Sequence, residues 1–109
     1  MGNPPPTLSI ILPAKNEAEG LRGTLPALKA AYPEAEIIVV DDGSTDATAQ
    51  IAAEQGARVL SSPYSMGNGA AIKRGARAAT GEVLVFMDAD GQHGAGHVRA
   101  LLDKLGDGY

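Results

Sequence analysis

The sequence predicts an α/β domain in which a parallel β-sheet carries helices on both faces. Short apolar runs at residues 7–12, 37–40, 57–60 and 83–87 alternate with segments that are compatible with helices. The run at 83–87 is apolar throughout, which is typical of a strand buried on both faces. Strands and helices that alternate through short links imply right-handed crossovers and parallel strands. With 109 residues, the chain has the usual size of one domain.

The first strand, at residues 7–12, is expected to lead into a helix that begins near Asn16 and continues towards Ala31. Asn16 is a favourable N-cap residue, and Glu19 follows three positions later, as in a capping box. We expect Pro26 to disturb this helix, because proline lacks the backbone donor and clashes with the preceding turn.

The second strand, at residues 37–40, runs directly into a polar segment. Ser44 or Thr45 is expected to cap the helix that continues to Gln55, and Gly56 suits the end of that helix. The remaining elements are expected in the order strand 57–60, helix 69–79, strand 83–87 and helix 98–105.

Composition narrows the classes of function. The formal net charge is −4 and there is no long basic run, so we expect no nucleic-acid partner. The absence of cysteine excludes disulfides and thiolate metal sites. No apolar run approaches the ~20 residues that span a bilayer, so we expect no transmembrane segment and a cytoplasmic protein, peripheral to a membrane in its full-length context. Residues 1–6 form a proline-rich lead-in, and residues 7–109 are expected to form a single domain.

Two acidic residues follow the run at 83–87. Asp88 and Asp90 are separated by Ala89, and Gly91 permits a turn. Turn formation alone explains one aspartate before a glycine. Two carboxylates at the end of an apolar strand repel each other unless a cation offsets their charge, which favours a metal site. Carboxylate oxygens suit Mg²⁺ or Mn²⁺, often with a substrate phosphate in the shell, and Gln92 can add a neutral oxygen.

Two further polar segments follow predicted strands. Because the carboxyl ends of parallel strands share one edge of a sheet, we expect these segments to lie beside residues 88–90. Asp41 and Asp42 suit a loop and a ligand contact equally well when taken alone, and the neighbouring acids favour the ligand. Lys15 is placed to meet a diphosphate near a helix N-terminus, and Glu17 to accept from a base or a sugar.

Four segments carry a resemblance to a known family: Pro13-Ala14-Lys15-Asn16-Glu17, Asp41-Asp42-Gly43-Ser44-Thr45-Asp46, Gly67-Asn68-Gly69-Ala70-Ala71 and Asp88-Ala89-Asp90-Gly91-Gln92-His93. In order and spacing they resemble the nucleotide-sugar half of glycosyltransferase family 2, and most of all its polyprenyl-phosphate (dolichyl-phosphate mannose or glucose) synthase-like members. The resemblance extends from about residue 8 to residue 105. Each segment is modest alone, and the four in register are specific.

This resemblance implies a Rossmann-like GT-A fold and a nucleoside-diphosphate-sugar donor, such as a GDP- or UDP-hexose. It suggests a polyprenyl phosphate as the acceptor. It also implies a transfer that inverts the anomeric carbon, in which a base of the enzyme deprotonates the acceptor hydroxyl. The implied contacts with the nucleotide and its diphosphate are Pro13, Lys15, Glu17, Val40, Asp42, Asp88 and Ala89. The implied ligands of Mg²⁺ or Mn²⁺ are Asp88, Asp90 and Gln92.

The sequence departs from the family in two places. Residues 94–96 read Gly-Ala-Gly, where relatives commonly carry an acidic residue and proline. The chain ends at Tyr109, so we expect the general base and the acceptor-binding half beyond that position. The expected protein is therefore a donor-binding part of a larger GT-A domain. We expect it to be inactive alone or completed by self-association through the exposed edge of the 83–87 strand.

Two other functions remain open at this stage. The first is a nucleotide-binding module without turnover, which follows if the acceptor half is missing. The second is a phosphatase of the haloacid-dehalogenase type, with Asp88 as nucleophile and Asp90 as acid/base. This second function is disfavoured, because Gln92 stands where threonine is usual and the acids follow the fourth strand.

Overall fold

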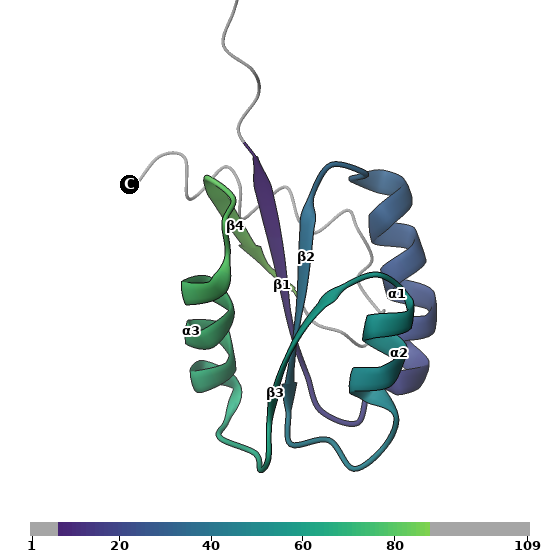
Figure 1. Cartoon of the computed structure of the whole chain (residues 1–109), viewed down its shortest axis with the longest axis vertical. Helices are drawn as coiled ribbons and strands as arrows, with labels where there is room; N and C mark the ends of the chain where they lie inside the picture. Colours follow the sequence, from purple (N-terminus) through teal and green to yellow (C-terminus); the bar gives the residue numbers. More distant parts are fainter. Residues whose placement is uncertain (1–6, 88–109) are drawn as a thin grey trace, which may run out of the picture.

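The computed structural model describes residues 7–87, which form a parallel sheet with helices on both faces (Figure 1). The four strands lie in the order β3-β2-β1-β4, and each neighbouring pair is parallel. The predicted fold class is confirmed. In chain order the elements are β1 (Leu8–Ala14), α1 (Ala18–Ala31), β2 (Glu36–Asp42), α2 (Thr48–Glu54), β3 (Arg58–Ser62), α3 (Asn68–Ala78) and β4 (Val83–Phe86).

Two hydrophobic layers cover the two faces of the sheet. Successive side chains of a strand point to opposite faces, and β1 follows this rule. Ile10 and Leu12 pack in a cluster with Leu25 of α1 and with α2, whereas Ile11 packs with Ala71 of α3. Figure 1 shows α1 and α2 on one side of the sheet and α3 on the other. The middle parts of the central strands, residues 10–12 and 37–40, are apolar because both of their faces are buried.

The central strands reach the carboxyl edge of the sheet together. Ala14 of β1 pairs with Asp41 of β2, and Asp42 pairs with Ser62 of β3. Strand β2 is thus longer than the sequence predicts and includes both aspartates, because pairing with β1 and β3 continues through them. Both carboxylates therefore project from a hydrogen-bonded strand and not from a loop.

The start of α1 differs from the prediction. The helix begins at Ala18 with Glu17 as its N-cap residue, and no side chain of its own caps it. The predicted capping box of Asn16 and Glu19 is therefore wrong. Asn16 has a left-handed backbone (φ 53°), and Glu19 instead forms an exposed ion pair with Arg22.

Pro26 does not interrupt α1, which runs from Ala18 to Ala31. Proline at this position removes the donor for the carbonyl of Arg22, one turn earlier. Both residues lie on the exposed side of the helix, so water can hydrate that carbonyl. The apolar side of the helix, with Leu21, Leu25 and Leu28, stays buried against the sheet.

The second helix also starts later than predicted. Its N-cap residue is Ala47, and neither Ser44 nor Thr45 caps it. Its C-terminal end matches the prediction, because Gly56 has a positive φ of 86° that glycine adopts without strain. Ser44 and Thr45 instead form hydrogen bonds with Asn16 in the loop after β1.

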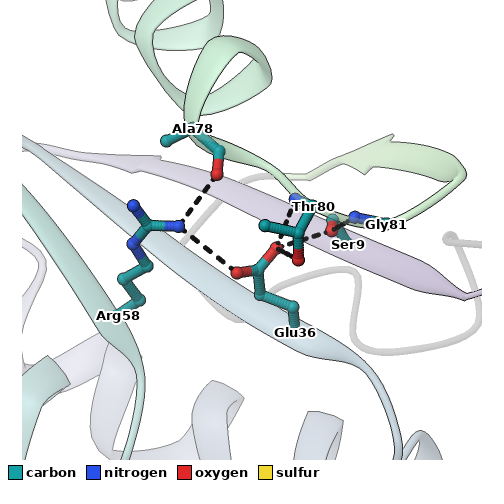
Figure 2. A network of polar contacts seen from close by, with 6 residues as sticks. All are labelled: Ser9, Glu36, Arg58, Ala78, Thr80 and Gly81. Carbon is teal, nitrogen blue, oxygen red and sulfur yellow. Dashed lines mark hydrogen bonds and ion pairs between the residues drawn. The ribbon is translucent and has the colours of Figure 1, made fainter.

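A polar network joins the elements at the amino edge of the sheet (Figure 2). Glu36, the first residue of β2, accepts hydrogen bonds from the Ser9 hydroxyl (2.8 Å) and the Thr80 N–H (2.9 Å). Its other oxygen lies 3.4 Å from a guanidinium nitrogen of Arg58 in β3. Ser9 in turn accepts from the Gly81 N–H at 2.8 Å. One carboxylate therefore links three strands and the turn before β4.

Gly75 allows α3 to lie close to the sheet. A Cβ atom at this position would overlap the Ile11 Cγ2 methyl and lie 3.2 Å from Val40 Cγ2. We expect Gly75→Ala to lower the free energy of unfolding by about 1–3 kcal/mol, because overpacking exceeds the helix-propensity gain of about 1 kcal/mol. Gly69→Ala is the matched control, since a Cβ there meets open space in the same helix. Urea unfolding checks the pair, and equal stability of the two variants would contradict the packing argument.

Some predicted features lie outside the described residues. These are the lead-in at residues 1–6 and the helix at residues 98–105. Within the described sheet, β4 is an outer strand that pairs with β1. Association through this strand stays a prediction, and light scattering over a range of concentrations can check it.

Candidate functional site

The loops after β1, β2 and β3 lie together at the carboxyl edge of the sheet. They comprise residues 15–17, 43–47 and 63–67. The Asn16 N–H donates to the Ser44 hydroxyl (2.9 Å), which joins the first loop to the second. The Met66 N–H donates to Asp42 (2.7 Å), which joins the third loop to the end of β2. The predicted convergence of the segments after β1 and β2 is therefore present, and the loop after β3 lies beside them.

Asp42 holds the loop after β3. One carboxylate oxygen accepts from the Met66 N–H, and the other accepts from the Ser65 hydroxyl (2.9 Å) and the Gly67 N–H (3.1 Å). The residue is buried, with 8% of its surface exposed, so these bonds replace most of the water it would otherwise contact. A carboxylate with three donors is stable in its ionised form.

The electrostatics of Asp42 agree with this geometry. The Met66 N–H is the largest cause of a pKa below the ordinary value, and burial opposes it. The Ser65 and Gly67 hydrogen bonds and the positive charge of Lys15 lower the pKa further. Lys15 is exposed and follows β1 directly, so the structure brings this predicted residue close to Asp42.

The backbone of the loop after β3 packs directly against Gly43. Its φ is +74°, and a Cβ atom would lie 2.5 Å from the Ser65 backbone nitrogen and 2.6 Å from the Tyr64 carbonyl carbon. Only glycine permits both the left-handed backbone and this close approach. The side chains of Tyr64 and Met66 project from the same loop, 66% and 52% exposed.

Asp41 has a different role from Asp42. One of its oxygens accepts from the Ser44 N–H at 3.0 Å, and the other lies 3.5 Å from the Ser61 hydroxyl. These bonds shape the turn that follows β2. The sequence left open which aspartate serves local structure: Asp41 bonds to its own following turn and to β3, whereas Asp42 holds the loop after β3.

The N-terminus of α1 is capped by residues that precede or begin α2. The Glu17 N–H donates to the Thr48 hydroxyl (2.9 Å), and the Ala18 N–H lies 3.4 Å from Asp46. Asp46 also accepts from the Thr48 hydroxyl and from its N–H at 2.9 Å. The hydrogen bond from the Thr48 hydroxyl is the largest cause of a lowered pKa for Asp46, against the effect of burial. An acid near a helix N-terminus also suits the helix dipole.

Pro13 and Val40 are neighbours in the sheet, since they are paired between β1 and β2. The Val40 side chain is buried with Ile11 and Ala71, so a ligand contact at Val40 would involve its backbone. Glu17 is half-buried at the start of α1. All five predicted nucleotide contacts in residues 13–42 therefore lie near this edge: Lys15 is exposed, Pro13 and Glu17 are half-buried, and Val40 and Asp42 are buried.

The predicted metal residues lie outside the described part of the chain: Asp88, Ala89, Asp90 and Gln92. Among residues 7–87, no three His, Cys, Asp or Glu side chains gather as a metal site would require. Strand β4 runs parallel to β1, and the Met87 N–H donates to the Ile11 carbonyl at 3.1 Å. The strand that precedes Asp88 thus runs towards the edge that carries Asp42.

A family comparison identifies this arrangement. The family model described as Glycosyl transferase family 2 matches residues 9–109, which is nearly the entire chain. The chain belongs to glycosyltransferase family 2. The resemblance found in the four sequence segments is confirmed.

Two relatives within the family illustrate the similarity. An uncharacterized glycosyltransferase of Mycobacterium bovis is 40% identical over 101 residues, which cover 93% of this chain and 44% of that protein. An undecaprenyl-phosphate 4-deoxy-4-formamido-L-arabinose transferase of Pseudomonas fluorescens is 38% identical over 112 residues, which cover 94% of this chain and 33% of that protein. The chain thus spans less than half the length of these family 2 relatives.

Solved family 2 structures share the fold. The glucosyl-3-phosphoglycerate synthase of Mycobacterium tuberculosis, in complex with Mn²⁺ and UDP-glucose, superposes with a TM-score of 0.69 at 35% identity and covers 78% of this chain and 33% of that chain. A mannosyltransferase of Pyrobaculum calidifontis, in complex with GDP-Man and Mn²⁺, gives a TM-score of 0.70 at 27% identity and covers 78% and 28%. The GT-A fold predicted from the sequence is confirmed.

Sequence reasoning missed two parts of this family 2 edge. It assigns no partner to the loop of residues 63–67, although Ser65 and Gly67 bind Asp42. It also treated Asn16 as a cap for its own helix, whereas its side chain binds the loop after β2. The available signal was that asparagine tolerates a left-handed backbone better than most residues.

In the described part of the chain, no helix is both long and apolar enough to cross a membrane.

Proposed function

We propose that this chain is the donor-binding part of a family 2 glycosyltransferase and takes a nucleoside-diphosphate hexose. The observation that carries the proposal is the gathering of Lys15, Asp42 and the loops of residues 43–47 and 63–67 at one edge of a GT-A sheet. Two of the similar solved structures are complexes with Mn²⁺ and either UDP-glucose or GDP-Man. Membership of family 2 also favours sugar transfer over the phosphatase alternative.

The proposed nucleotide contacts follow from the places of the residues. Pro13 and the main chain of Val40 flank the edge between β1 and β2. Lys15 supplies a positive charge close to Asp42, where a diphosphate would balance it. Glu17 and Asp42 offer acceptors to a base or a ribose, and Asp42 does so with the part of its carboxylate that the loop after β3 does not use.

The proposed metal residues suit Mg²⁺ or Mn²⁺ by their chemistry. Asp88 and Asp90 supply carboxylate oxygens and Gln92 an amide oxygen, which are the hard ligands these ions take. When bound, the ion neutralises charge on the diphosphate leaving group. Ala89, between the two acids, is proposed to lie against the ribose and diphosphate.

The proposed acceptor is a polyprenyl phosphate, because a relative of 38% identity is named as an undecaprenyl-phosphate transferase. The alternative of a binding module without turnover predicts the same nucleotide binding but no transfer. A donor-hydrolysis assay separates the two, because turnover that is lost in Asp88→Asn supports an active transferase.

Calorimetry with UDP and GDP tests the donor site. We expect one of these nucleotides to bind with Mn²⁺ present, and Asp90→Ala to weaken that binding by roughly tenfold or more. Asp103→Ala is the control, because it removes an aspartate outside the pattern of two acids. The proposal fails if neither nucleotide binds with metal present, or if Asp90→Ala leaves metal-dependent binding intact.

A further inference from the structure

We propose that Asn16 is a positioning residue, which holds Lys15 and Glu17 in place relative to Asp42 by joining the loop after β1 to the loop after β2. This inference rests on the proposed function and names a residue that acts through its neighbours.

The backbone of Asn16 is unusual among the described residues. It is the one non-glycine residue of residues 7–87 with a positive φ, at 53°. Such a conformation is costly for most side chains and less so for asparagine. The turn that it makes places Lys15 before a sharp change of direction and Glu17 directly after it, at the start of α1.

The side chain of Asn16 binds the neighbouring loop. Its amide oxygen accepts from the Thr45 N–H (2.8 Å), the Thr45 hydroxyl (3.3 Å) and the Asp46 N–H (3.3 Å). Its own backbone N–H donates to the Ser44 hydroxyl at 2.9 Å. These bonds connect positions about 28 to 30 residues apart in the chain. Asn16 is therefore the joint between the two loops.

The joint lies between groups that the proposed site needs together. Lys15 and Glu17 flank Asn16, and residues 44–46 follow Asp42 and Gly43 directly. Lys15 lies close enough to Asp42 for its positive charge to lower the pKa of that carboxyl. Loss of the amide oxygen would remove three of the hydrogen bonds between the two loops and leave only the bond from the Asn16 N–H to Ser44 in place.

Three substitutions separate positioning from backbone conformation. Asn16→Gly permits the left-handed backbone but lacks the amide oxygen. Asn16→Ala disfavours that backbone and also lacks the oxygen, whereas Asn16→Asp keeps an acceptor oxygen. If Asn16 positions its neighbours, the glycine and alanine variants should bind UDP or GDP with Mn²⁺ about tenfold more weakly, and the aspartate variant should recover most of the affinity. Circular dichroism checks that each variant is folded.

A second measurement does not depend on nucleotide binding. NMR titration of Asp42 reports the charge of Lys15, and Lys15→Met gives the pKa of Asp42 without that charge. We expect Asn16→Gly to raise the pKa of Asp42 towards the Lys15→Met value. If the wild-type chain binds neither nucleotide, the proposed function fails and the titration still decides the role of Asn16. An Asn16→Gly variant with the wild-type pKa of Asp42 would overturn the inference.

Discussion

Alanine at position 43 is expected to lower the free energy of unfolding by about 2–4 kcal/mol and to weaken nucleotide binding at the same time. Gly43 has a φ of +74°, which an alanine side chain disfavours. Its added Cβ would also lie 2.5 Å from the Ser65 nitrogen and 2.6 Å from the Tyr64 carbonyl carbon. Backbone atoms cannot move aside as a flexible side chain can, so the loop after β3 must shift away from Asp42.

Gly67→Ala is the matched control for this prediction. Gly67 also has a positive φ, at +97°, but a Cβ there meets nothing within 4 Å. This variant should lose only the backbone term, about 1–3 kcal/mol, because a φ of 97° with a ψ of 159° is essentially restricted to glycine. Urea unfolding measures the two stabilities, and calorimetry with UDP or GDP measures the binding. Equal losses in the two variants would show that the contact between Gly43 and the loop after β3 has no energetic weight.

The sequence predicts the sheet well because the sheet depends on local patterns. Apolar runs such as residues 83–87 must be buried on both faces, and alternation with helices then requires parallel strands. The pattern also places Lys15, Asp42 and the segment after β4 at one edge, since that edge is common to all parallel strands. The family resemblance adds their chemical roles, which the apolar pattern alone cannot supply.

The sequence fails where residues far apart in the chain satisfy each other. Asn16 and Asp46 both suit helix capping by local rules, yet each binds a segment about 28 residues away or more. The same holds for Asp42, whose donors lie 23 to 25 residues further along. Polar side chains have several partners of similar energy, and tertiary packing decides among them. Local preference therefore identifies the residues and not their partners.

Glu36→Ala is expected to lower the free energy of unfolding by about 1–3 kcal/mol, because it leaves partners of the carboxylate without an acceptor. Among them is the hydroxyl of Ser9, which is fully buried. Arg58 loses its ion pair and keeps its hydrogen bond to the Ala78 carbonyl at 2.8 Å, as Figure 2 shows. Glu34→Ala is the control, since within the described residues this exposed carboxylate has no hydrogen bond or ion pair. Comparable losses of stability in both variants would contradict the role given to this network.

The same network predicts how stability depends on pH. Partial burial opposes ionisation of Glu36, but hydrogen bonds from the Thr80 N–H, Ser9, the Thr80 hydroxyl and Arg58 outweigh it and hold the pKa of the carboxyl below its ordinary 4.5. A lowered pKa in the folded state means that ionised Glu36 stabilises the fold above about pH 4.5, and that this contribution is lost as the pH falls through the folded pKa.

Glu36→Gln tests this dependence, because glutamine keeps the size of the side chain and does not titrate. Asp42 and Asp46 also have lowered pKa values, but both proteins contain them, so their effects cancel in the comparison. Urea unfolding at a series of pH values should show the largest difference between wild type and Glu36→Gln above about pH 4.5. The difference should shrink steadily at lower pH, as protonation makes the wild-type side chain neutral as well. A difference that stays constant down to low pH would mean that the charge of Glu36 does not stabilise the amino edge of the sheet.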